Sequence, residues 1–239
     1  MHKIDDEVLF ETPRLRIQYA VKNDITTLHE NIFSNIQVMR YLLDGTCLSL
    51  QETQQFVAQH FAQCGQNLGF LCIFEKSSNQ LIGFCGLLYC DYDQQLAMQK
   101  KQQNQQNQQP HQQSIEFGYA LAPQYWGKGY AHEVGLAQIH YAFKQWPSAQ
   151  IFASCHPNNR ASIRSVEKLE AAYIGSIAGL DELIKLPNKL PCVFRTIYSL
   201  SLYQVSYLQR LERFFFELTH QQLSAMAPPI LQENRLRHR

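Results

Sequence analysis

The chain has 239 residues, of which 45% are apolar, and its formal net charge is +1. This length and composition predict a globular domain with a sizeable core and exclude a generally disordered chain. The balanced charge argues against a broad nucleic-acid-binding surface, and no run approaches the roughly 20 apolar residues that a membrane span needs.

The cysteines predict a reducing compartment. There are seven of them, no CxxC occurs, and several lie in apolar runs such as LIGFCGLLYC. An odd number without paired spacing is typical of reduced core thiols, not of a disulfide framework. The opening MHKIDDEVLF lacks the apolar stretch of a signal peptide. We therefore expect a cytoplasmic protein.

The N-terminal part predicts a strand followed by two helices. Residues 14–20 alternate apolar and polar side chains, which is typical of a half-buried strand. A helix is expected over about 25–33, capped by the preceding Asn-Asp pair. A second helix is expected over 49–64, where Ser49 and Glu52 have the spacing of a capping box.

The middle of the chain predicts a hairpin and an insertion. Strands 68–76 and 81–90 flank the turn SSNQ, and another strand follows at 114–122. The intervening residues 94–113 are rich in glutamine. Such a tract buries almost nothing, so we expect a mobile loop at a hairpin tip.

Helices and strands alternate in the rest of the expected domain. Two apolar stripes over 129–145 predict a helix that is buried on much of its surface. A strand at 150–156, a helix at 159–169 and strands at 171–179 and 192–202 complete the pattern. This order predicts one mixed α/β domain with a central, largely antiparallel sheet and helices on both faces.

The tail is expected to be separate from a domain that covers 8–202. Residues 203–239 begin with an amphipathic helix, over 203–218, and end with the basic run RLRHR. The helix either packs on its own domain or forms a surface for a partner.

Two glycines stand before the buried helix, in PQYWGKGYAHE. The first N–H groups of a helix have no internal partner, and the helix dipole favours negative charge there. Gly127 and Gly129 leave room for a phosphate to approach those N–H groups, and Lys128 adds positive charge. The run predicts an anion cradle, although a plain turn would use the same glycines. It is neither a Walker loop nor a dinucleotide fingerprint, because the required residues are missing.

Four segments in register resemble the GCN5-related N-acetyltransferase (GNAT) family, in particular its branch of ribosomal-protein and amino-terminal acetyltransferases. Gln124, Gly127 and Gly129 fill that family's pyrophosphate motif, Q/R-x-x-G-x-G/A. IEFGYALAP is similar to the branch's fourth strand, NNRASIRSVEKL to its N-x-x-S-x-x-x-x-x-K-L helix, and FETPRLRIQYA to its first strand. The likeness departs after K-L, where Glu170 and Ala171 stand in place of Gly-Phe.

The resemblance implies acetyl-coenzyme A (acetyl-CoA) as co-substrate. In this family it lies in a wedge where two parallel strands splay apart, here 114–122 and 150–156. The resemblance places its pyrophosphate on the backbone amides from Trp126 to Ala131. The cofactor-binding residues implied are Leu121, Gln124, Trp126, Gly127, Lys128, Gly129, Tyr130, Ala131 and Asn159.

The resemblance also implies direct transfer of the acetyl group to an amine. Glu116 is the candidate base that takes the amine's proton, and a structural hydrogen bond is its alternative role. Asp181 and Glu182 are weaker candidates for the base. Ser162 is the candidate that gives a proton or hydrogen bond to the departing thiolate. Met39, Arg40 and Tyr41 are expected near the acceptor, a protein N-terminus or a small-molecule amine.

Other polar pairs predict no chemistry. Cys155 and His156 are neighbours on an expected strand, so they point to opposite faces and form no catalytic dyad. His132 and His140 share a helix, but no further ligand spacing supports a metal. We expect no metal, no nucleic acid and no membrane as partners, and leave open whether the chain is a homodimer.

A second class of function is a non-catalytic acyl-CoA-binding module that regulates a partner through its C-terminal helix. The presence of both Glu116 and Ser162 argues against it. Nucleic-acid binding by RLRHR rests on a few basic side chains in the tail and is a weaker reading.

Overall fold

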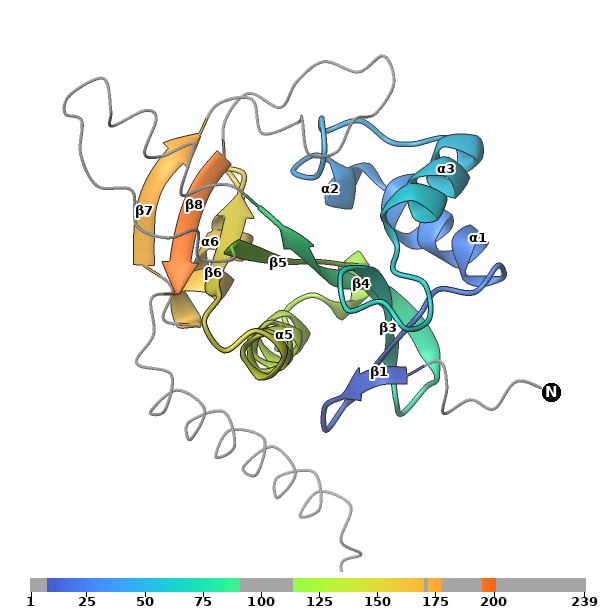
Figure 1. The fold of residues 1–239 in the computed structure, drawn as a ribbon. Helices are drawn as coiled ribbons and strands as arrows, with labels where there is room; N and C mark the ends of the chain where they lie inside the picture. Colours follow the sequence, from blue (N-terminus) through green and yellow to red (C-terminus); the bar gives the residue numbers. More distant parts are fainter. Residues whose placement is uncertain (1–7, 91–113, 170–171, 178–194, 201–239) are drawn as a thin grey trace, which may run out of the picture. The chain divides into compact units, whose positions relative to one another are not determined.

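The computed structural model describes residues 8–90, 114–169, 172–177 and 195–200 (Figure 1). All of them belong to one compact unit of the chain, residues 1–201. The glutamine-rich insertion, Asp181, Glu182 and the tail from 203 lie outside the described residues. The expected boundary between the domain and the tail therefore stays a prediction.

The described strands form one eight-stranded sheet in the order β1-β2-β3-β4-β5-β6-β8-β7 (Figure 1). They are β1 (Val8–Glu11), β2 (Leu15–Gln18), β3 (Gly69–Glu75), β4 (Gln80–Tyr89), β5 (Ser114–Leu121), β6 (Gln150–Cys155), β7 (Ala172–Ile177) and β8 (Arg195–Leu200). Every neighbouring pair is antiparallel except β5 and β6, which are parallel. The predicted largely antiparallel sheet with one parallel pair is confirmed.

Helices cover both faces of this sheet, as predicted (Figure 1). The helical segments are α1 (Asp24–Leu28), the π-helical η2 (His29–Phe33), α2 (Ile36–Met39), α3 (Leu50–His60), the 3-10 turn η3 (Pro123–Tyr125), α5 (Tyr130–Gln145) and α6 (Arg160–Lys168). Ala120 packs with the cluster that includes α1 to α3, whereas Leu121 packs with the cluster that includes α5. Successive strand residues point to opposite faces, so the two clusters lie on opposite sides of the sheet.

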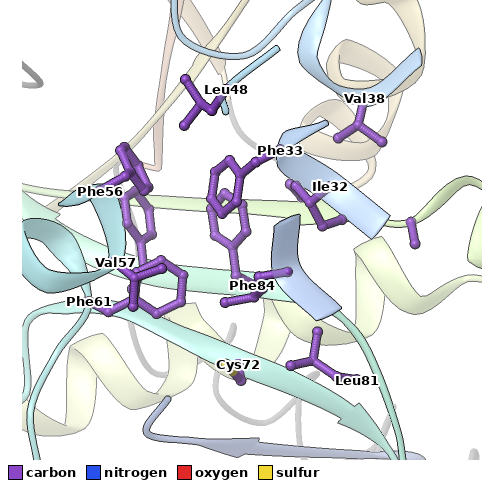
Figure 2. Close-up of a cluster of buried hydrophobic side chains, with 14 of the residues drawn as sticks. Ile32, Phe33, Val38, Leu48, Phe56, Val57, Phe61, Cys72, Leu81 and Phe84 are labelled. Carbon is purple, nitrogen blue, oxygen red and sulfur yellow. The ribbon is translucent and has the colours of Figure 1, made fainter. Parts of the chain in front are cut away.

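Aromatic side chains hold the first three helices on their face (Figure 2). Phe33 of η2 lies between α3 and the sheet: its ring centroid is 5.1 Å from that of Phe56 and 5.3 Å from that of Phe84. Phe70 of β3 contacts Phe84 at 5.0 Å. Such rings bury large apolar areas, so this cluster fixes where the helices stand over β3 and β4.

The start of α3 follows its capping residues, whereas its end is set by a contact with the sheet. Ser49 and Glu52 form the predicted capping box at the start of α3. That helix ends at His60 and not at residue 64, because Phe61 is extended and bridges to Phe70.

The start of α1 differs from the prediction. Asn23 makes no side-chain cap hydrogen bond, and α1 begins at Asp24. The Asp24 carboxylate accepts instead from the N–H of Val21 at 2.9 Å, which closes the turn before the helix. The predicted helix continues to Phe33, but its second half is π-helical.

Three short elements were not predicted: the 3-10 turn η3, the strand β1 and the helix α2. The strand expected over 14–20 is β2, and it has a hairpin partner, β1, with Phe10 opposite Ile17. The short helix α2 is capped by Asn35, whose side chain accepts from the N–H of Gln37 at 3.0 Å. Elements of this length contain too few residues to show a hydrophobic period.

A pair of opposed glycines tests the packing of β3, β4 and β5. Gly86 lies opposite Gly118 in the β4–β5 register. A Cβ on Gly86 would lie 2.5 Å from the Gly69 carbonyl oxygen, whereas a Cβ on Gly118 would meet nothing within 4 Å.

We expect Gly86→Ala to lower the free energy of unfolding by about 2 kcal/mol, because backbone must move to admit the methyl group. Gly118→Ala is the matched control and should change it by no more than about 0.5 kcal/mol. Chemical denaturation measures both. Equal stability of the two variants would contradict the close approach at Gly86.

Candidate active site

The parallel strands β5 and β6 separate after three residue pairs. They pair at Ser114–Gln150, Ile115–Ile151 and Glu116–Phe152. Beyond these pairs β5 continues along β4, and β6 continues along β8. Within the described residues this leaves the predicted splay between the ends of the two strands.

The backbone of β5 is open toward this splay. The N–H of Ala122 donates to Ile82 O at 2.8 Å, and the N–H of Cys90 donates to Ser114 O at 3.0 Å. Antiparallel bonding alternates along a strand, so the even-numbered residues of β5 bond to β4 and the odd-numbered ones face β6. Tyr119 and Leu121 therefore direct backbone groups into the splay.

One of the two backbone groups of Leu121 that could bind a ligand is already hydrogen-bonded within the protein. The indole Nε1 of Trp126 donates to the Leu121 carbonyl oxygen at 2.7 Å. The backbone N–H of Leu121 remains on the side of β5 that faces the splay. The backbone of Tyr119, which the sequence did not single out, faces the same side by strand alternation.

The glycine loop before α5 has a left-handed backbone at both glycines. Gly127 has φ 75° and Gly129 has φ 81°, in the left-handed region that other residues rarely adopt. Gly129 is the N-cap of α5. Gln124, Trp126 and Lys128 are exposed beside it. The loop thus combines an accessible surface with a helix N-terminus.

The N–H groups of the loop define a narrower cradle than expected. The N–H of Trp126 already donates to Pro123 O at 3.1 Å, so this amide is not available. The first bond of α5 runs from Glu133 N to Gly129 O at 3.1 Å. The N–H groups from 127 to 131 therefore precede the helical bonding pattern, and no described residue accepts from them.

Tyr130 contributes to this cradle only through its backbone. Its side chain is buried, and its hydroxyl donates to the Glu75 carboxylate. Burial and the neighbouring Glu75 raise the pKa of Tyr130 to about 12. Hydrogen bonds from Ser78 and then Tyr130 lower the pKa of Glu75, so this carboxylate is charged at neutral pH.

Behind the loop lies an ion pair that the sequence analysis missed. Glu133 of α5 is fully buried, and its Oε2 accepts from Arg14 Nε at 2.6 Å. Its Oε1 accepts from the Thr12 hydroxyl at 2.5 Å and from the Arg14 N–H at 3.0 Å. A carboxylate between two apolar stripes of a helix could have signalled such a partner, because buried charges are paired.

The carboxylate of Glu116 lies on the face predicted from strand alternation. It shares the face of Ala120, which packs with the cluster of α1 to α3. The Ser154 hydroxyl of β6 donates to Glu116 Oε1 across the splay. A hydrogen bond of the structural kind is therefore present. Beside it, the position of Gly118 leaves open space on the same face.

The hydroxyl of Ser162 lies on the other face of the sheet. Its Oγ is 3.2 Å from the Sγ of Cys155, which follows Ser154 on β6 and so points to the opposite side. The Asn159 side-chain oxygen accepts from the N–H of Ser162 at 3.1 Å and caps α6. The amide NH₂ of Asn159 is thus left to donate to a ligand. Glu116 and Ser162 do not meet; they flank the splay.

Two of the three acceptor-side candidates lie at the end of β6. The ring of Tyr41 is 5.0 Å from that of His156, and the Arg40 guanidinium carbon lies 4.8 Å from the Tyr41 ring centroid. The prediction that Met39 lines the acceptor pocket is not supported. It is fully buried in the cluster of α1 to α3, so its side chain offers no surface to a substrate.

Other chemistry finds little support in the described ranges. No three His, Cys, Asp or Glu side chains gather there in a way that could hold a metal ion. None of the helices in the described part of the chain is both long and apolar enough to cross a bilayer. Burial raises the pKa of the Cys72 and Cys85 thiols, so both behave as protonated core residues.

Comparison with known proteins identifies the family. A model described as an acetyltransferase (GNAT) domain matches residues 14–172. The chain belongs to the GNAT acetyltransferases and is an acyltransferase enzyme. It is 26% identical over 167 residues to the uncharacterized Bacillus subtilis protein YkkB, covering 70% of this chain and 86% of the relative.

Solved structures share the fold. A spermidine N-acetyltransferase from Vibrio cholerae, in complex with CoA and spermine, has a TM-score of 0.56 at 17% identity, covering 82% of this chain and 98% of the neighbour. RimL, a ribosomal L7/L12 alpha-N-protein acetyltransferase in complex with CoA, has a TM-score of 0.56 at 14% identity, covering 81% and 97%. At these identities the likeness establishes the fold alone.

The exposed indole of Trp126 provides a direct test of the loop site. Trp126 is 44% exposed beside the cradle, and Trp146 at the far end of α5 is the only other tryptophan. In a Trp146→Phe protein, we expect acetyl-CoA to change the fluorescence of Trp126 in a saturable titration. A Trp126→Phe protein is the control and should show little change. A flat titration of the first protein, with binding confirmed by calorimetry, would place the ligand elsewhere.

Proposed function

We propose that the chain transfers an acetyl group from acetyl-CoA directly to a primary amine, either a protein N-terminus or a small-molecule amine. The observation that carries this proposal is the parting of β5 and β6 beside a loop with unpartnered N–H groups. The open backbone of β5 suits a ligand with amide groups, and the loop suits a diphosphate. Acetyl-CoA has both, in that order along its length.

The coenzyme-binding residues are proposed in three groups. The N–H groups from 127 to 131 would donate to the diphosphate oxygens, with the exposed Gln124 and Lys128 beside them. The backbone groups of Tyr119 and the N–H of Leu121 would pair with the pantetheine amides. The Asn159 NH₂ would donate to the same arm, since its oxygen is engaged in the helix cap.

Glu116 is proposed as the base on the acceptor side. The open space at Gly118 gives an amine access to the splay next to this carboxylate. Ser154 donates to one oxygen of Glu116, which orients the carboxylate across the splay. The carboxylate can take the proton of the amine, directly or through water. Arg40 and Tyr41 are proposed to line the approach.

Ser162 is proposed to serve the leaving group on the coenzyme side. Its hydroxyl can donate to the thiolate as the carbon–sulfur bond breaks. An N–H of β5 that faces the splay can donate to the oxyanion, and such a donor is worth about 3 kcal/mol in other acyl transfers. The amine would attack from the face of Glu116, so all three groups act around one carbon.

The acceptor is left as a class. RimL acts on a ribosomal protein, and the Vibrio enzyme is named for spermidine, so structural neighbours include both kinds of acceptor. A non-catalytic acyl-CoA-binding module remains the alternative function. We place the protein in the cytoplasm on its cysteine usage.

A thiol-release assay tests the proposal. With acetyl-CoA and a panel of amines and peptides, we expect release of free CoA that depends on at least one acceptor. Formation of the acetylated amine should match the thiol released. Coenzyme binding without acceptor-dependent release over the whole panel would favour the non-catalytic module.

The role of Glu116 has its own test in the same assay. Glu116→Gln keeps a hydrogen-bond partner for Ser154 but cannot take a proton. We expect turnover to fall by 10²-fold or more, the range for loss of a general base, and the pH–rate profile to change its shape. Ser34→Ala, at an exposed serine to which the proposal gives no role, controls for general effects of substitution on the assay. An unchanged pH–rate profile in Glu116→Gln would remove this residue from the role.

A further inference from the structure

Arg14 is tied to three parts of the coenzyme loop and its helix. Its Nε donates to Glu133 at 2.6 Å, its Nη1 donates to the Lys128 carbonyl oxygen at 2.9 Å, and its Cζ lies 4.4 Å from the ring centroid of Tyr130. It comes from the turn before β2, more than a hundred residues away in sequence. No other described cation donates to the loop backbone.

The contact with Lys128 fixes the direction of one peptide group. The Lys128 carbonyl and the Gly129 N–H belong to the same planar trans peptide, so they point in opposite directions. Because the carbonyl is held toward Arg14, the Gly129 N–H must point away from Arg14. Glycine at 127 and 129 would otherwise let this peptide rotate freely.

The contact with Glu133 removes an unfavourable charge. A buried carboxylate in the first turn of α5 would repel an anion bound at the same helix end. The Nε of Arg14, 2.6 Å from Glu133 Oε2, brings a positive charge that neutralises the carboxylate, and the Thr12 hydroxyl donates a hydrogen bond to Oε1. The Arg14 side chain is 25% exposed, so its charge also adds positive potential near the loop.

We propose that Arg14 is a positioning residue for the diphosphate of the coenzyme: it orients the Lys128–Gly129 peptide so that the Gly129 N–H can donate to the ligand. This inference rests on the proposed function. The fork of the guanidinium is required, because one side chain must reach the Glu133 carboxylate and the Lys128 carbonyl together.

Arg14→Gln alone would combine two effects. It would remove the bond to the Lys128 carbonyl, and it would leave the Glu133 carboxylate buried without its cation. The double variant Arg14→Gln/Glu133→Gln separates them by removing both charges. Arg14→Lys keeps a charge opposite Glu133 but lacks the second arm, and it serves if the double variant does not fold. Arg16→Gln is the matched control. Arg16 bonds to Gln18 and Asn79 and does not touch the loop.

Calorimetry with two ligands reads out the effect. Acetyl-CoA carries the diphosphate, whereas S-acetylpantetheine lacks it. For the double variant and for Arg14→Lys, we expect the Kd of acetyl-CoA to rise about tenfold, the size of one lost charge-assisted hydrogen bond. The Kd of S-acetylpantetheine should change by less than about twofold. Arg16→Gln should bind both ligands as the native protein does.

The outcomes separate this inference from the proposed function. If the native chain does not bind acetyl-CoA, the proposed function fails. If the native chain binds it and a folded Arg14 variant, judged by its melting temperature, binds it equally well, Arg14 is only structural and the inference is overturned. Equal weakening of both ligands would overturn it too, because the loss would not then concern the diphosphate.

Discussion

The site depends on two strands that cannot stay together. β5 remains bonded to β4 along its whole length, and β6 remains bonded to β8 from Ile151 to Cys155. Each strand is therefore held from its outer side, and the pair separates after Glu116 and Phe152. Buried backbone groups need partners, so an open strand edge inside a domain is a place where a ligand completes the sheet. The glycine loop lies at the end of β5 and extends that edge by a helix N-terminus.

The two faces of the sheet supply different parts of the site. On one face, the aromatic cluster of Phe33, Phe56 and Phe84 fixes the helices that bring Arg40 and Tyr41 to the end of β6. On the other face, α5 presents the loop, and α6 presents Ser162. The helices on both faces are thus positioned relative to the same two strands.

The sequence predicted those features that residues close together in the chain determine. The capping box at Ser49 and Glu52, the glycine turn before a helix at 127 and 129, and the buried helix α5 all follow from short patterns. The parallel pair and its splay came from the resemblance of four motifs in register and not from periodicity.

What could not be predicted depends on distant contacts or on very short elements. β1 and α2 have four residues each, too few to establish a period. Met39 stands beside the exposed Arg40 and the partly exposed Tyr41, and only the fold reveals that it points into the core. The partnership of Arg14 with Glu133 and Lys128 joins segments more than a hundred residues apart, and no local rule connects them.

The placement of Glu116 and Ser162 on opposite faces has a kinetic consequence under the proposed function. The amine and acetyl-CoA would enter the site from opposite faces of the sheet, so both can be bound at the same time. A ternary complex is then the reacting species, and the protein itself never carries the acetyl group. Because neither route of entry blocks the other, the two substrates could bind in either order. The acetylated amine could also leave while CoA is still bound.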